Sequence, residues 1–130
     1  MKFCTVINCM DGRAQLPVIT YLQKRFDAEY VDSVTEAGPD KILAKQNNTA
    51  LVQGILARLN ISVDKHKSVG IAVVGHHDYA GNPAPHDEQI TDIKKSVEFL
   101  RSLHRNTTVI GLWVDSDFEV HEVVDVEVSG

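Results

Sequence analysis

The segment Val69–Val74, which reads Val-Gly-Ile-Ala-Val-Val, constrains the fold more than any other part of the chain. A short run of small and branched apolar residues without alternation is typical of a β-strand that is buried on both faces. Strands of that kind lie in parallel sheets whose two faces are covered by helices. The segment therefore predicts a layered α/β fold.

The other apolar residues support this fold, because strand-like runs alternate with residues at helical spacing. We expect strands at Lys2–Cys9, Glu29–Val34, Val69–Val74 and Thr107–Val114, and an edge strand at Phe118–Val128. Helical spacing runs from Leu16 to Phe26, from Ile42 to Leu59 and from Ile90 to Leu100. The polar stretch Lys45–Thr49 leaves open whether the second pattern is one helix or two. The order of elements predicts a three-layer α/β/α fold with a mainly parallel sheet of about four to five strands.

Length and charge narrow the class of protein. The 130 residues suit a single hydrophobic core, so we expect one domain over residues 1–130. The formal net charge is −5 and no cluster of Lys and Arg is present, which argues against partners such as nucleic acid or an anionic membrane. No apolar stretch approaches the ~20 residues that span a bilayer, and no signal-peptide pattern is present. We therefore expect a cytoplasmic protein.

The two cysteines, Cys4 and Cys9, are expected to be free thiols. They are five residues apart in an expected strand, which separates them by ~16 Å and points their side chains to opposite faces. A disulfide requires Cα atoms within ~7 Å, so these two cysteines cannot form one together.

Polar residues gather where the expected strands end. In open parallel sheets, ligands bind outside the carboxyl ends of the strands, where the strand order reverses. Residues of this kind are Cys9, Asp11 and Arg13 after the first strand, His76, His77, Asp78 and Tyr79 after the third, and Asp115 and Asp117 after the fourth. This edge of the sheet is therefore the candidate functional site.

A thiol at a strand end is usually a small core residue, but the neighbours of Cys9 favour a second interpretation. Arg13 would favour the thiolate, and His76 is expected to end an adjacent strand. A thiolate and an imidazole that converge in this way form half of a zinc site. Successive residues point to opposite sides, so we expect His76 to face the site and His77 to face away. Asp78 either orients a neighbouring imidazole or arginine, or is a turn residue.

Two further strand-end segments have both a functional and an ordinary interpretation. Gly38-Pro39-Asp40 is expected to start a helix, whose free N–H groups would suit an anion, although the segment also fits a tight turn. Asp115 and Asp117 would suit a hard cation or a solvated turn. The chain has no P-loop, no G-x-G-x-x-G and no G-x-S-x-G motif, so nucleotide, hydride-transfer and esterase chemistry are unsupported.

Three segments, in this order, resemble motifs of the beta-class carbonic anhydrases. Cys9-Met10-Asp11-Gly12-Arg13 is similar to their C-x-D-x-R segment, and Gly75-His76-His77-Asp78-Tyr79-Ala80-Gly81 resembles G-H-x-x-C-G. Thr35–Pro39 stands where the family has its Asn-Ala-Gly stretch. The resemblance covers about residues 1–115 and describes a compact version of the family without its long N-terminal helices.

The resemblance implies a function and a set of site residues. It implies that Cys9 and His76 bind zinc and that Asp11 and Arg13 form the catalytic dyad. With metal bound, the protein would be a carbonate dehydratase-like lyase that hydrates CO₂ to bicarbonate, or acts on a related small electrophile. It also implies a homodimer or a higher homo-oligomer.

The sequence departs from the family pattern at Tyr79, which stands in place of the second cysteine ligand. A neutral phenol with a pKa of ~10 is a poor zinc ligand, so we expect weakened zinc binding or none. Asp11, Asp78 and Tyr79 are the candidates for the third ligand. The alternative function is a non-catalytic relative that binds a small anion through Arg13 and the helix start at Gly38. A further alternative is a structural domain in which these residues make only internal hydrogen bonds.

Overall fold

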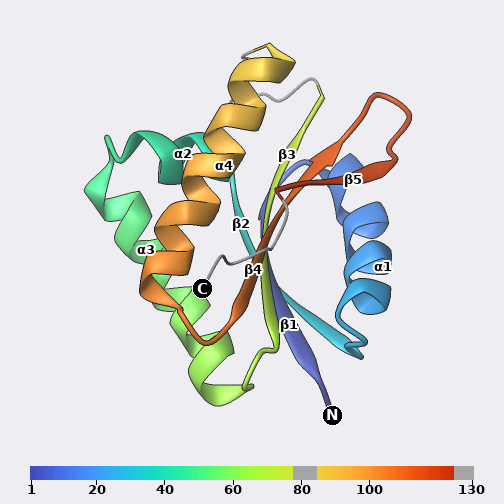
Figure 1. Ribbon diagram of the computed structural model, residues 1–130, viewed down its shortest axis with the longest axis vertical. Helices are drawn as coiled ribbons and strands as arrows, with labels where there is room; N and C mark the ends of the chain where they lie inside the picture. The colour runs from blue at the N-terminus through green and yellow to red at the C-terminus, as the bar shows by residue number, and fades with distance from the viewer. Residues whose placement is uncertain (78–84, 125–130) are drawn as a thin grey trace.

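The fold is a five-stranded sheet between two layers of helices, as the sequence predicts (Figure 1). The computed structural model describes residues 1–77 and 85–124. In chain order the elements are β1 (Phe3–Cys9), the 3₁₀-helix η1 (Gly12–Ala14), α1 (Gln15–Arg25), β2 (Tyr30–Glu36), α2 (Pro39–Lys45), α3 (Thr49–Lys65), β3 (Gly70–His76), α4 (His86–Leu103), β4 (Thr108–Val114) and β5 (Val120–Val124). Helix α1 covers one face of the sheet, and α2, α3 and α4 cover the other (Figure 1).

The strand order is β2-β1-β3-β4-β5, and only β5 is antiparallel to its neighbour. The chain moves outward from β1 to β2, then crosses back to β3 on the other side of β1. The strand order therefore reverses between β1 and β3, which is where parallel sheets of this type bind ligands. Cys9 ends β1 and His76 ends β3, so the topology brings both residues to that point.

The core has two halves because successive side chains of a strand point to opposite faces. Beneath α1 the sheet contributes residues such as Val6, Ala72 and Val74, which pack on Val18 and Leu22. The opposite half contains Ile7, Ile71 and Val73 from the sheet, packed against Ile55 and Leu59 of α3 and Ile93 and Val97 of α4. All seven residues of β3 are buried, as its apolar run predicts.

Several predicted boundaries are wrong by a few residues. Strands β2 and β3 each continue two residues beyond their predicted ends, because backbone pairing with β1 and β4 persists through polar residues such as Glu36 and His76. The predicted edge strand begins at Val120 instead of Phe118, because residues 115–119 form the turn that reverses the chain. Residues 125–128 of that prediction lie outside the described ranges.

The interrupted helical pattern is two helices. Gln46 ends α2 in the left-handed conformation, with φ 59°. The Asn48 side chain then accepts a hydrogen bond from the Leu51 N–H at 3.1 Å and caps the start of α3. Of the helices in the described ranges, none has the length and hydrophobicity that crossing a bilayer requires.

A buried hydroxyl cluster anchors α3 to the sheet at the end opposite the candidate site. The Ser62 hydroxyl donates to Asp32 Oδ2 at 2.6 Å, and it lies 2.5 Å from Thr5 Oγ1 and 2.6 Å from Ser68 Oγ. Because Ser62 has one proton to donate, its oxygen accepts from the other two hydroxyls. Ser62 therefore satisfies three polar groups at once.

We expect Ser62→Ala to lower the free energy of unfolding by about 1–3 kcal/mol, because it leaves buried polar groups without this shared partner. Urea denaturation measures the change. Ser102→Ala is the matched control, since the exposed Ser102 hydroxyl bonds only the Phe99 carbonyl within its own helix in the contacts described. Equal stability of the two variants would contradict an anchoring role for Ser62.

Candidate functional site

Two buried side chains, Cys9 and His76, meet where β1 and β3 end. Cys9 is 2% exposed and His76 is 4% exposed. The Cys9 side chain is near enough to His76 to shift the pKa of its imidazole, although the two residues come from different strands and are far apart in the sequence. A thiol and an imidazole thus lie close together at the point where the strand order reverses. Both cysteines of the chain are free thiols, as expected.

The His76 ring has a defined orientation. Its Nδ1 lies 2.7 Å from the His77 carbonyl oxygen, which can only accept, so Nδ1 carries a proton and donates it. Nε2 then faces Asp11, whose Oδ2 is 4.0 Å away. A ligating imidazole is commonly held in this way by a carbonyl on its other nitrogen.

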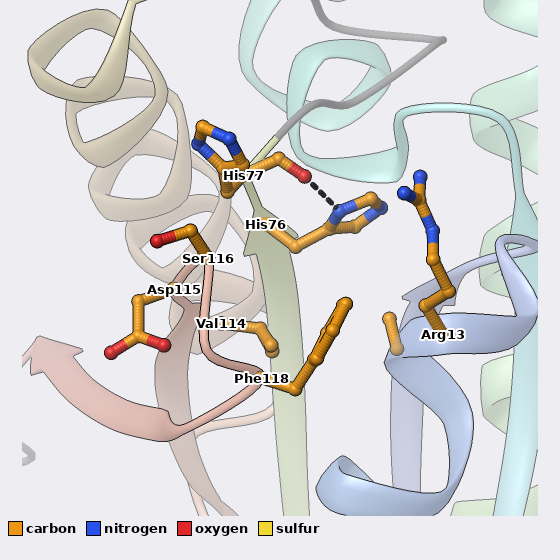
Figure 2. Close-up of a pocket in the computed structure, with 8 residues that line it drawn as sticks. Arg13, His76, His77, Val114, Asp115, Ser116 and Phe118 are labelled. Atoms are coloured by element: carbon orange, nitrogen blue, oxygen red, sulfur yellow. Dashed lines mark hydrogen bonds between the residues drawn. The ribbon is translucent and has the colours of Figure 1, made fainter.

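His77 points away from His76, as Figure 2 shows. Its backbone N–H donates to the Val114 carbonyl at 2.9 Å and so ties the end of β3 to the end of β4. The contribution of His77 to the site is therefore its backbone, through this bond and the bond to His76.

Asp11 and Arg13 form a two-pronged ion pair beside His76. Arg13 Nε donates to Asp11 Oδ1 at 3.0 Å, and Arg13 Nη2 donates to Oδ2 at 2.6 Å. The Arg13 backbone N–H also donates to Oδ1, at 2.9 Å, so Asp11 caps the short helix η1. These bonds to Arg13 hold the pKa of the Asp11 carboxyl well below its usual range, helped by the charge of His76 and opposed only by partial burial.

We expect Arg13→Ala to raise the pKa of Asp11 toward its ordinary value of ~3.9, because the two side-chain bonds to the carboxylate are lost and only the backbone bond of residue 13 remains. A ¹³C NMR titration of the Asp11 carboxyl measures this. Because the folded-state pKa is lowered, ionised Asp11 stabilises the fold above pH ~3.9, and this contribution disappears as the pH falls through the lowered pKa. Arg25→Ala, which removes a pair with Glu122, is the control. An Asp11 titration that is the same in both variants would contradict the pairing.

The pKa of His76 is raised. Burial acts to lower it, but hydrogen bonds to Cys9 and to the His77 carbonyl, together with the charges of Cys9 and Asp11, outweigh burial. In the metal-free site the imidazole therefore keeps its second proton to a higher pH than an ordinary histidine does. Binding of a metal ion would require this proton to leave, so affinity for the ion would rise with pH.

Two residues that sequence reasoning missed hold the loop between β1 and α1 in place. The Asn8 side chain accepts from the Cys9 N–H at 2.8 Å and donates to the Ala14 carbonyl at 3.1 Å. Gln15 Nε2 donates to the Cys9 carbonyl at 2.6 Å. The fully buried Asn8, a polar residue at the end of an apolar strand run, was the available signal for this role.

Cys9, His76 and Asp11 together offer the donor types that zinc binds, namely a thiolate, an imidazole nitrogen and a carboxylate oxygen. Ligand bonds of ~2.0–2.3 Å in a tetrahedral site place donor atoms about 3.3–3.8 Å apart. The 4.0 Å between His76 Nε2 and Asp11 Oδ2 is close to this spacing. The donor types therefore fit zinc, but the ligand atoms of Cys9, Asp11 and His76 do not all lie within 4.8 Å of one another, so binding of the ion would have to draw these side chains together. Two further candidate ligands, Asp78 and Tyr79, lie outside the described residues.

The helix start at Gly38, the other part of the predicted anion site, is buried and carries a carboxylate in its first turn. Gly38 is buried, with φ 72°, and it precedes the seven-residue helix α2. Asp40, in the first turn, is fully buried, and its Oδ1 accepts from the Lys41 N–H at 2.9 Å. A carboxylate at this position opposes the binding of a second anion, so Arg13 is the stronger part of the anion-binding interpretation.

The segment from Asp115 to Glu119 is the turn between β4 and β5. Asp115 Oδ1 accepts from the backbone N–H groups of Asp117 and Glu119, and Oδ2 lies 2.7 Å from His121 Nε2. Asp115, Glu119 and His121 bring ligand atoms within 4.8 Å of one another, which makes them a possible acidic/histidine metal site. The sequence predicts Asp115 and Asp117 as the candidate cation ligands. In the structure Asp117 instead donates its backbone N–H to Asp115, and Glu119 and His121 are the other members of the group.

A cavity of about 250 Å³ lies beside His76, between η1 and the β4–β5 turn. Figure 2 shows the side chains of Arg13, His76 and Phe118 gathered around it. Phe118 has φ 61°, a left-handed conformation that costs an L-residue about 1–2 kcal/mol and normally favours glycine. The turn holds it there through bonds from Phe118 N–H to the Asp115 carbonyl and from Asp115 N–H to the Glu119 carbonyl, both at 3.0 Å.

Comparisons with known proteins agree with this architecture. A family model described as "Putative carbonic anhydrase" matches residues 1–124. No curated protein matches the chain significantly by sequence.

Solved structures share the fold at low sequence identity. A carbonic anhydrase from Glaciozyma antarctica is 16% identical, with a TM-score of 0.63 over 92% of this chain and 81% of that chain. One of two tetrameric beta-carbonic anhydrases from Sordaria macrospora is 13% identical, with a TM-score of 0.61 over 93% and 79%. CafA, a beta-carbonic anhydrase of Aspergillus fumigatus, is 14% identical, with a TM-score of 0.62 over 96% and 76%. At these identities the likeness concerns the fold alone.

Proposed function

The chain belongs to the carbonic anhydrase family whose model spans residues 1–124, and on this basis we propose that it catalyses the reversible hydration of CO₂ to bicarbonate with zinc. The observation that carries the proposal is the convergence of Cys9, Asp11, Arg13 and His76 at one edge of the sheet. In this proposal Cys9 and His76 bind the zinc ion. Asp11 and Arg13 form the dyad beside it.

Zinc, when bound, supplies a Lewis acid that lowers the pKa of a coordinated water to ~7. The protein residues have separate tasks. Arg13 keeps Asp11 ionised, so that Asp11 Oδ2 can accept a hydrogen bond from the reacting water and orient it. The bond from Nδ1 of His76 to the His77 carbonyl keeps Nε2 directed into the site.

The third protein ligand is the open part of this proposal. Asp11 can fill that place only by giving up part of its pairing with Arg13, because both of its oxygens bond the guanidinium. Asp78 and Tyr79 are the other candidates, and both lie outside the described residues. A replacement of Asp11 by Asn separates these options: zinc content is retained if Asp11 orients water and is lost if Asp11 is a ligand.

The first test is zinc content per chain, by elemental mass spectrometry, followed by stopped-flow CO₂ hydration on the loaded protein. About one zinc ion per chain and hydration above the buffer rate support the proposal. No zinc after loading would overturn it and leave the anion-binding alternative at Arg13. Self-association is part of the proposal, because the Sordaria macrospora relatives are described as tetrameric, and light scattering of the purified chain measures it.

A further inference from the structure

Strands β1 and β3 separate from each other before either of them ends. Their parallel pairing ends with Ile7 opposite Val73. Beyond that point β1 continues to Cys9 through its pairing with β2, and β3 continues to His76 through its pairing with β4. The sheet is therefore divided at the carboxyl ends of these two strands, a feature called the β1–β3 split below. Cys9 and His76 lie on its two sides.

The backbone of Cys9 faces the β1–β3 split. Met10, the next residue, donates its N–H to the Glu36 carbonyl of β2 at 2.9 Å. Successive residues of a parallel strand direct their N–H and C=O groups to alternate neighbours, so those of Cys9 are directed to the side of β3. In an uninterrupted ladder they would bond the backbone of β3, because Gly75 is in register with Cys9.

Two side-chain amides replace β3 as hydrogen-bond partners of this backbone. The Cys9 N–H donates to Asn8 Oδ1 at 2.8 Å, and the Cys9 carbonyl accepts from Gln15 Nε2 at 2.6 Å. Asn8 Nδ2 donates in turn to the Ala14 carbonyl at 3.1 Å, which ties the amide to the start of α1. Asn8 is fully buried, so solvent does not compete for its bonds. The backbone groups that would close the split are therefore satisfied without β3.

The split also decides whether the two side chains can meet. Cys9 follows Ile7 by two residues, so it belongs to the face of the sheet that α3 and α4 cover. His76 follows Val74 by two residues and belongs to the face beneath α1. In a paired ladder, side chains on opposite faces are separated by the backbone. With β1 and β3 unpaired at this point, Cys9 is near enough to raise the pKa of the His76 imidazole.

We propose that Asn8 and Gln15 are positioning residues that hold the β1–β3 split open, so that Cys9 and His76 can bind the same metal ion. The inference rests on the proposed zinc site for its function. The hydrogen bonds that carry it belong to the metal-free chain, so they can be tested without the metal. Asn8 is the stronger of the two, because it is buried and bonds both the strand and the start of α1.

The first measurement is amide hydrogen exchange and ¹H–¹⁵N NOE spectroscopy of the metal-free full chain. Asn8→Leu keeps the side chain apolar and of similar size but removes the acceptor of the Cys9 N–H. We expect the Cys9 amide to exchange at least ~10-fold faster than in the parent, or to gain NOE contacts with β3 where the split closes. The Ile7 amide, inside the remaining β1–β3 ladder, is the reference for general stability. A Cys9 amide with the parent's exchange rate relative to Ile7 and the parent's contacts would overturn the proposal.

The second measurement is a titration with cobalt(II), which replaces zinc because its thiolate complexes absorb light. Asn8→Leu should lower the affinity for cobalt about 10–100-fold and weaken the thiolate-to-cobalt band, as loss of a residue that orients a ligand does. Ser62→Ala is the matched control, since it removes buried hydrogen bonds at the opposite end of the sheet. It should keep the parent's affinity and band. An equal loss in both variants, or in neither, would overturn the positioning role.

A second variant covers the case in which Asn8→Leu does not fold. Gln15→Leu changes a half-buried side chain at the start of α1 and removes its bonds to the carbonyls of Cys9 and Asp11. It should lower cobalt affinity in the same direction, and parent affinity in this variant would overturn the proposal. If the parent itself binds neither zinc nor cobalt, the proposed zinc function fails, and the amide measurements alone decide whether the two side chains hold the split.

Discussion

Replacement of Cys9 by serine is expected to lower zinc affinity more than ~100-fold and to reduce CO₂ hydration to the buffer rate. Changes to residues that only orient a ligand already cost about 10–100-fold in metal affinity, and loss of a ligating thiolate should cost more. Cys9 is 2% exposed and lies beside His76, and the other cysteine, Cys4, is buried elsewhere on β1, so no second thiol is placed to replace it. Zinc content and stopped-flow hydration measure the two effects.

Cys4→Ala is the matched control, because Cys4 is the other buried thiol on β1. Burial, helped by the charge of Asp32, raises the pKa of Cys4 to about 11. Cys4 therefore stays protonated at neutral pH and is a poor metal ligand. The control should keep full zinc content, and a Cys9→Ser protein that also keeps it would place the metal elsewhere.

Replacement of Gly75 by alanine is expected to lower the free energy of unfolding by about 1–3 kcal/mol, as overpacking of a closed core does. A Cβ atom at this position would lie 2.9 Å from Asp40 Oδ2, 2.9 Å from Ile93 Cδ1 and 3.3 Å from Gln89 Oε1. All three residues are buried, so none can move aside into solvent. Because Gly75 directly precedes His76, the strain should also displace the imidazole and weaken zinc binding.

Gly54→Ala is the matched control for this change and should raise the free energy of unfolding instead of lowering it. Gly54 lies inside α3, and the nearest atom to a new Cβ is Arg58 Nη2 at 3.8 Å. Alanine there should raise the free energy of unfolding by about 0.5–1 kcal/mol, because glycine is a poor helix former. Urea denaturation compares both variants with the parent, and a Gly75→Ala protein as stable as the parent would refute the packing argument.

The sheet and its two layers of helices could be predicted, because buried strands and helices have characteristic patterns of apolar residues in the sequence. Val69–Val74 lacks the alternation of a half-exposed strand, and β3 is buried along its whole length. The strand ends were less accurate, because backbone pairing continues through polar residues such as Glu36 that carry no apolar signal.

The site was predicted in part. Cys9, Asp11, Arg13 and His76 could be nominated because they end or follow an apolar run, and the resemblance of their segments to known motifs gave Asp11 and Arg13 the role of a dyad. Asn8 and Gln15 were missed, since they act through bonds to backbone carbonyl and N–H groups whose positions depend on the folded loop. That the chain forms one domain over residues 1–130 stays a prediction.

The sequence by itself determined the α/β architecture, the two free thiols and the edge of the sheet that carries the polar groups, because these follow from periodicity and spacing along the chain. Only the tertiary structure decided that β1 and β3 are neighbours and that His76 lies beside Cys9, since strand order depends on how the helices cross over the sheet. It also decided the backbone conformation of Phe118. Its left-handed backbone results from hydrogen bonds across a turn between two paired strands, and no property of a phenylalanine in the sequence indicates that conformation.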